Sequence, residues 1–128
     1  METLITSGVE VAVETFFQAE QSNVLSGTFI FSYHIEISNH NNFTIQLLRR
    51  KWIITDSNFD VREVEGEGVV GRQPVLYAGG TYQYVSGCNL SSAIGKMEGT
   101  YIFQNKNTGE EFEVKIPVFK LVAPAILN

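Results

Sequence analysis

The chain has 128 residues, of which 44% are hydrophobic and 18% are charged, and its formal net charge at pH 7 is -5. This length allows one domain with a real core and leaves no room for a second, and the composition excludes intrinsic disorder. A negative chain without a basic stripe is also a poor match to a nucleic-acid binder, which must neutralise phosphates. We therefore expect one globular domain over residues 1–128 and no nucleic-acid partner.

The first ten residues, METLITSGVE, do not resemble a secretory signal, because Glu2 stands where Lys or Arg is usual and no apolar segment follows. No apolar run approaches the ~20 residues that a membrane-spanning helix requires. Cys88 is the single cysteine, so no internal disulfide can form and a reducing compartment fits best. These features predict a cytoplasmic protein without a membrane partner.

Apolar residues recur with a period of two along most of the chain, which is typical of strands with one wet face. In residues 28–38, TFIFSYHIEIS, the aromatic and aliphatic side chains alternate with Ser, His and Glu. Similar alternation occurs in residues 9–13, 81–86, 97–104 and 111–117, and turn-forming clusters occupy residues 56–58, 78–80 and 105–109.

About seven short strands at this spacing predict an all-β fold, an antiparallel β-sandwich, with a small barrel as the rival architecture. Trp52 is expected in a central strand with its indole in the core. The adjoining basic cluster, residues 49–51, lies within the same run, so alternation should send its charges to opposite faces.

Residues 66–71, GEGVVG, match the GxGxxG pattern of dinucleotide-binding loops. In those folds a helix follows the glycines, but here Pro74 and a double glycine leave no length for one. Two hypotheses remain. Gly66, Gly68 and Gly71 serve the backbone through positive φ or close packing, or the loop forms a phosphate-binding nest completed by Arg72.

A calcium loop and a catalytic group are both poorly supported. Asp56, Asn58, Asp60 and Glu67 fall at EF-hand spacing, but Val61 occupies the position that needs glycine.

Cys88 with His34 or His40 lacks any local signature of a nucleophile, and these three residues lack zinc-site spacing. We therefore expect no catalytic residue, no metal site, no cofactor and no enzymatic activity.

The sequence resembles the ApaG family in the ordered blocks WIITD, GEGVVGRQPVL and SGC, with GTYIF and EFEVKIPVFKL beyond them. The resemblance runs from about residue 8 to residue 121, so residues 122–128 are a C-terminal extension outside the pattern. It implies an immunoglobulin-type sandwich similar to fibronectin type III and a protein of poorly defined role, linked by name to cobalt and magnesium tolerance.

Related eukaryotic domains recognise protein partners, which makes a protein-binding module the leading hypothesis here. The alternative, also suggested for the family, is a small-ligand protein that holds a pyrophosphate or nucleotide phosphate at Gly66, Gly68 and Gly71.

Overall fold

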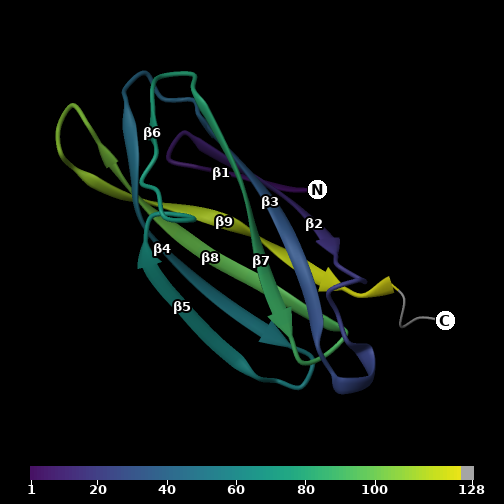
Figure 1. Cartoon of the computed structure of the whole chain (residues 1–128). Helices are drawn as coiled ribbons and strands as arrows, with labels where there is room; N and C mark the ends of the chain where they lie inside the picture. The colour runs from purple at the N-terminus through teal and green to yellow at the C-terminus, as the bar shows by residue number, and fades with distance from the viewer. Residues whose placement is uncertain (125–128) are drawn as a thin grey trace.

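The computed structural model describes residues 1–124 as a sandwich of two antiparallel sheets (Figure 1). Within these residues the chain forms nine strands and one short 3-10 helix. Their bounds are β1 Glu2–Thr6, β2 Val9–Phe17, η1 Val24–Ser26, β3 Phe29–Asn39, β4 Ile45–Asp56, β5 Val61–Glu67, β6 Val75–Leu76, β7 Thr81–Leu90, β8 Ile94–Asn105 and β9 Glu111–Val122.

One sheet has the strand order β1-β2-β3-β7, and the other has the order β5-β4-β8-β9, with β6 also paired to β4. The sandwich that the alternation predicts is therefore confirmed, and the barrel is not formed. The expected count of about seven strands is too low. The five-residue β1 and the two-residue β6 are too short to show a clear alternation, and β1 lies before the expected family core at residue 8.

The core lies between the sheets, and most residues that fill it come from alternate positions of the long strands β2, β3, β4, β7, β8 and β9, whereas β1 and β5 contribute none. Phe29, Phe31, Tyr33, Ile35 and Ile37 are all buried, as the period of two predicts. The intervening side chains of β3 face outward.

Trp52 is buried on β4, the second strand of its sheet, as expected. Its ring packs edge-on against Tyr33 and Phe119, with centroid separations of 5.4 and 5.8 Å. The contact with Tyr33 of β3 joins the two sheets through large aromatic surfaces, whereas Phe119 of β9 belongs to the same sheet as Trp52.

The basic cluster on β4 is divided between the two faces, as predicted. Arg49 and Lys51 reach exposed glutamates on the outer face, at 2.7 Å from Glu111 and 3.6 Å from Glu65. Arg50 instead donates to two backbone carbonyls beside β5.

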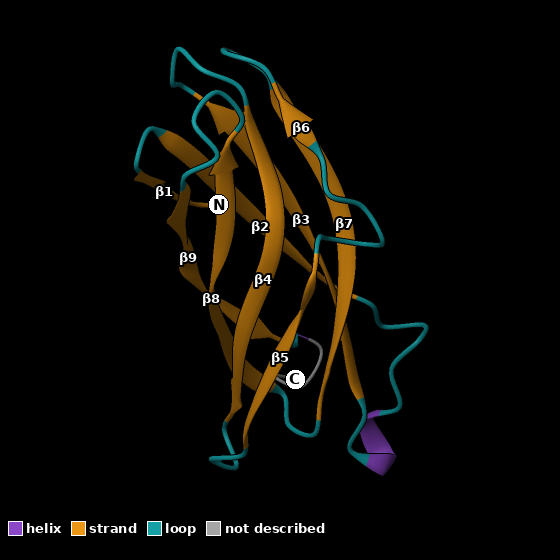
Figure 2. Cartoon of the chain, turned by 90° about the vertical axis from the view of Figure 1, so that its left-hand side faces the viewer, coloured by secondary structure: helices purple, strands orange, loops and turns teal. Residues whose placement is uncertain are grey.

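The two long sides of the sandwich differ. On one side β1 lies beside β9, where the Lys115 amide donates to Thr6 Oγ1. On the other side the edge strands β5 and β7 face each other (Figure 2), and the Arg62 guanidinium on β5 reaches the Asn89 carbonyl on β7. This second side contains the features from which the candidate site is built.

The chain end adds one contact to the sandwich. Val122 completes β9, Ala123 is buried, and the Ala123 amide donates to the Ala93 carbonyl at 2.9 Å. The rest of the predicted extension, residues 125–128, lies outside the described residues. No helix within residues 1–124 is long and apolar enough to cross a membrane.

Candidate functional site

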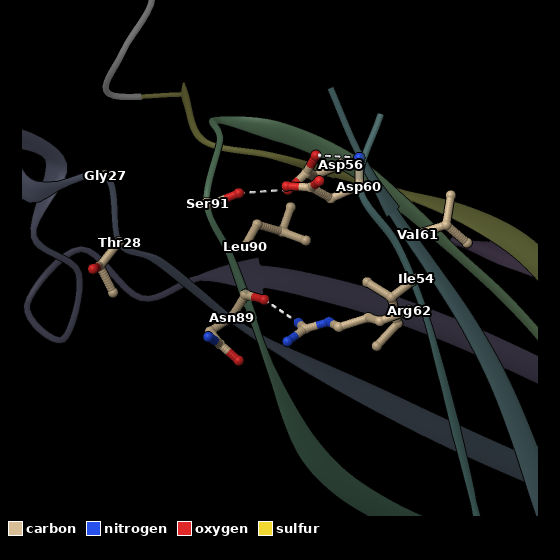
Figure 3. A pocket seen from close by; sticks show the side chains of 10 residues that line it. All are labelled: Gly27, Thr28, Ile54, Asp56, Asp60, Val61, Arg62, Asn89, Leu90 and Ser91. Atoms are coloured by element: carbon tan, nitrogen blue, oxygen red, sulfur yellow. Dashed lines mark hydrogen bonds between the residues drawn. The ribbon is translucent and has the colours of Figure 1, made fainter. Parts of the chain in front are cut away.

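An open pocket of about 320 Å³ lies at one end of the sandwich, on the side where β5 faces β7 (Figure 3). The end of β4, the start of β5, the end of β7 and the segment before β3 surround it. Its lining residues are Gly27, Thr28, Ile54, Asp56, Asp60, Val61, Arg62, Asn89, Leu90 and Ser91.

Asp56 organises the turn beside this pocket. Its carboxylate accepts hydrogen bonds from Ser91 Oγ at 2.5 Å, from the Asn58 amide at 2.9 Å and from the Asp60 amide at 3.3 Å. The Ser91 hydroxyl, together with these amides, holds the pKa of Asp56 below its usual value. A carboxylate engaged in this way stabilises its turn and is a poor proton acceptor near neutral pH.

Arg62 extends from β5 across the side of the pocket. Its guanidinium donates to the Asn89 carbonyl and contacts Cys88 Sγ at 3.6 Å, so it ties the two sheets together. Cys88 is only 7% exposed, and burial raises the pKa of its thiol. The thiolate that a nucleophile requires is therefore disfavoured near neutral pH.

The structure does not bring a histidine to Cys88. His34 lies on the outer face of β3, where its ring packs 4.6 Å from that of Phe16. His40 Nε2 is 2.8 Å from Glu10 Oε1 instead. Among residues 1–124 no group of three or more His, Cys, Asp or Glu side chains is placed to hold a metal ion.

The calcium-loop spacing corresponds to a β-hairpin and an edge strand. Asp56 and Asp60 belong to the turn between β4 and β5, whereas Glu67 lies at the far end of the seven-residue β5. An extended strand of this length separates its ends by about 20 Å, so these carboxylates do not surround one ion.

The residues of GEGVVG form the end of β5 and a tight turn that interrupts the sheet edge. Gly68 has φ +62°, and its amide donates to the Leu48 carbonyl at 2.9 Å. Val69 and Arg72 then exchange two backbone hydrogen bonds, at 2.8 and 3.0 Å. Val70 and Gly71 between them have φ values of +47° and +76°, the pattern of a type I′ hairpin turn.

Gly66 has a different role from the other two motif glycines. It pairs with Arg50 across the β4–β5 ladder, and a Cβ at this position would lie 2.7 Å from Arg50 Nη1. The guanidinium crosses this space to donate to the carbonyls of Glu67 and Gly68, each at 3.0 Å. Gly66 therefore leaves room for an arginine that fastens the start of the turn.

A phosphate nest needs several free backbone amides directed at one point. In this loop the amides of Gly68, Val69 and Arg72 already donate to backbone carbonyls. The geometry thus supplies a backbone role for all three glycines. Phosphate binding at Gly66, Gly68, Gly71 and Arg72 stays a prediction, which calorimetric titration with pyrophosphate can test.

Phe59 is a feature that the sequence analysis missed. It lies in the turn between β4 and β5 with φ +64°, and its amide donates to the Asp56 carbonyl at 3.1 Å. The turn closes with the Asp56 amide bonded to the Asp60 carbonyl, also at 3.1 Å. A turn of this kind usually has glycine at the left-handed position, yet here an aromatic residue occupies it and is 89% exposed.

Val70 repeats this combination at the other end of β5. It is a β-branched residue at φ +47°, and it is 61% exposed. Between Phe59 and Val70, every residue of β5 is exposed except the half-buried Gly66. We call the set formed by Phe59, residues 61–67 and Val70 the β5 surface.

The model of the ApaG domain matches residues 19–105. A Brucella abortus protein named Protein ApaG is 44% identical over 124 residues, which are 97% of this chain and 95% of the relative. A Vibrio vulnificus Protein ApaG is 45% identical over 120 residues, 94% of each chain. A crystal structure titled as a putative ApaA protein from Bordetella pertussis has a TM-score of 0.87 and 42% identity, and the match covers 91% of this chain and 94% of that one.

Proposed function

This chain belongs to the ApaG family, and from that premise we propose that it is a non-enzymatic binding module that recognises a protein partner through the β5 surface. The observation that carries the proposal is Phe59, an aromatic residue held almost fully exposed in a strained backbone conformation. Such strain persists only where the surrounding structure enforces it, and it is concentrated at functional sites.

The fold gains little stability from the Phe59 side chain. A bulky residue in the left-handed region costs on the order of 1–3 kcal/mol, and an 89% exposed ring recovers little of this by burial. Glycine or asparagine would form the same turn at lower cost. Phe59 is therefore better suited to binding than to folding, and aromatic side chains are common anchors of protein interfaces.

The chemistry near the pocket supports a binding role over catalysis. The Asp56 carboxylate is hydrogen-bonded within its own turn, and Cys88 is a buried thiol. His34 and His40 contact Phe16 and Glu10 instead of Cys88. Within residues 1–124 the geometry assembles no nucleophile with a base and an orienting group. A link to cobalt and magnesium tolerance follows from the family resemblance alone and stays a prediction.

The test compares two variants that each remove one exposed ring. Phe59→Asn deletes the proposed anchor and introduces a residue that tolerates positive φ, so its Tm should equal or exceed that of the wild type. Tyr77→Asn is the matched control, because Tyr77 is 73% exposed and its carbonyl accepts from Asn39 at the end of β3, whereas the pocket lies beside the start of β3. Each immobilised protein is incubated with lysate of the native host.

We expect one protein to be retained by the wild type and the Tyr77→Asn variant and lost from the Phe59→Asn variant. The complex is then rebuilt from purified components, and its Kd should rise at least tenfold in Phe59→Asn, the loss of a typical interface anchor. Equal affinity of all three proteins for every retained partner would contradict the proposal.

A further inference from the structure

The free side of β5 presents backbone hydrogen-bonding groups in a fixed order. β5 is the last strand of its sheet and pairs only with β4. The Asp56 amide donates to the Asp60 carbonyl, and the Gly68 amide donates to the Leu48 carbonyl, so even-numbered residues direct their backbone groups toward β4. Odd-numbered residues of β5 consequently direct theirs outward.

The outward amides and carbonyls of β5 alternate as donors and acceptors along its edge, as in a strand that can pair with another. The Glu67 carbonyl accepts from Arg50 Nη1. Within residues 1–124, no hydrogen bond engages the outward amides and carbonyls of Val61, Glu63 and Glu65. A row of this kind pairs readily with a further extended chain.

Three glutamates lie on one face of this edge. The side chains of Glu63, Glu65 and Glu67 share the outer face, because the alternate residues Arg62 and Val64 pair with β4 residues of the core face. We call these three residues the glutamate row. Within residues 1–124 only Glu65 forms an ion pair, with Lys51 at 3.6 Å, because Arg49, the cross-strand partner of Glu67, pairs with Glu111 instead.

The alternate face of β5 has a different character. Arg62 is turned toward β7, Val64 is 38% exposed, and Gly66 is covered by the Arg50 guanidinium. A side chain placed over this face meets one cation on each side of an apolar centre. Apolar or small neutral groups are therefore favoured there, and a second cation is not.

We infer that the protein partner binds by adding an extended segment to β5, with lysine or arginine at every second position and apolar or small residues between them. The basic side chains lie opposite the glutamate row, where oppositely charged cross-strand pairs are stabilising. This inference rests on the proposed function and specifies the chemistry of the partner. A second copy of β5 is disfavoured, because its glutamates would lie opposite the glutamate row.

The probe is a synthetic peptide, acetyl-Lys-Val-Lys-Thr-Lys-Val-Lys-amide, with a control peptide of the same composition whose lysines are contiguous. Amide hydrogen exchange of the full chain is followed by NMR at saturating peptide. Exchange of the Glu63 and Glu65 amides should slow by about tenfold or more, because these amides gain partners. The Val64 amide, already bonded to β4, should not change.

The charge requirement is tested with the triple variant Glu63→Gln, Glu65→Gln and Glu67→Gln. We expect the Kd of the alternating peptide to rise by about tenfold, from the loss of three cross-strand charge pairs. All three residues are exposed, so the variant should fold.

The matched control changes Glu2, Glu20 and Glu110 to Gln, which gives the same net charge but alters exposed glutamates away from β5. Its Kd should change by less than about threefold, because charges beyond a Debye length are screened.

Two results would overturn the inference: equal affinity for the contiguous-lysine peptide, or unchanged exchange of the Glu63 and Glu65 amides at saturation. The proposed function fails separately, when no partner depends on Phe59. If a partner depends on Phe59 but the peptide does not slow exchange of the Glu63 and Glu65 amides, strand addition to β5 is refuted and the proposed function stands.

Discussion

Replacement of Gly68 by alanine tests why the GEGVVG sequence contains its glycines. The residue has φ +62°, and a Cβ built on it would lie 2.1 Å from the Arg72 carbonyl oxygen and 2.7 Å from the carbonyl carbon. Both atoms are backbone, so no side-chain rotation can relieve the clash. The Arg72 carbonyl is also the acceptor for the Val69 amide at 2.8 Å.

The expected cost has two sources. Placing an L-residue in the left-handed region costs about 1–2 kcal/mol. Moving the Arg72 carbonyl by about 1 Å to a normal contact distance weakens the paired hydrogen bonds between Val69 and Arg72, each of which contributes about 1 kcal/mol. We therefore expect Gly68→Ala to lower the free energy of unfolding by about 3 kcal/mol, equivalent to about 10 °C in Tm for a chain of this size.

Gly71→Ala is the matched control, because Gly71 has φ +76° but a Cβ there meets nothing within 4 Å. Gly71→Ala has only the conformational cost of the left-handed region, so it should lower the free energy of unfolding by about 1 kcal/mol. Urea unfolding of both variants, without any phosphate present, measures the two values. An equal decrease in the free energy of unfolding in the two variants would refute the predicted clash with the Arg72 carbonyl. A loss in Gly68→Ala that pyrophosphate restores would favour the phosphate-loop hypothesis.

Three further predictions concern the turn, the core and the acid limit of stability. Val70→Asn should raise Tm by about 3 °C, because asparagine tolerates positive φ in a type I′ turn, and a fall would contradict the assigned strain. Tyr101→Phe should cost about 1–2 kcal/mol in urea unfolding, since its buried hydroxyl lies 2.5 Å from that of Tyr84, and an unchanged midpoint would show that the pair contributes nothing. The pKa of Asp56 is lowered in the folded state, so the ionised carboxylate stabilises the fold above about pH 4. This stabilisation is lost as pH falls through the lowered pKa. Ser91→Ala should therefore make the fall in Tm below pH 4 shallower, and parallel curves would argue against that linkage.

The sequence predicts the sandwich because its long strands each bury one face. In β3 the alternation of Phe31, Tyr33 and Ile35 with polar residues corresponds directly to burial. The same reasoning fails for β5, whose sequence VREVEGE has no apolar face. An edge strand with both faces exposed is held by the backbone ladder to β4 and leaves almost no hydrophobic pattern to detect.

The site was predictable only in part, because its features depend on backbone conformation. The glycine pattern indicates special backbone positions, but Gly66 and Gly68 differ in cause, and neither cause is visible without Arg50 and Arg72 in place. Phe59 gives still less signal, since a phenylalanine in DSNFD looks like an ordinary turn residue until its positive φ is known.

The two hairpins that begin with β4 and β8 allow a comparison within one chain. The β8–β9 turn places Gly109 at φ +78°, where an added Cβ would meet nothing within 4 Å. The β4–β5 turn uses Phe59 in nearly the same conformation at φ +64°, also without burial of the side chain. Because glycine satisfies the geometry in one hairpin, the fold does not require a ring in the other. The exposed ring thus supports the proposal that a partner contacts it from outside. It lies beside β5, an edge strand whose outward backbone groups at Val61, Glu63 and Glu65 have no hydrogen bond within residues 1–124.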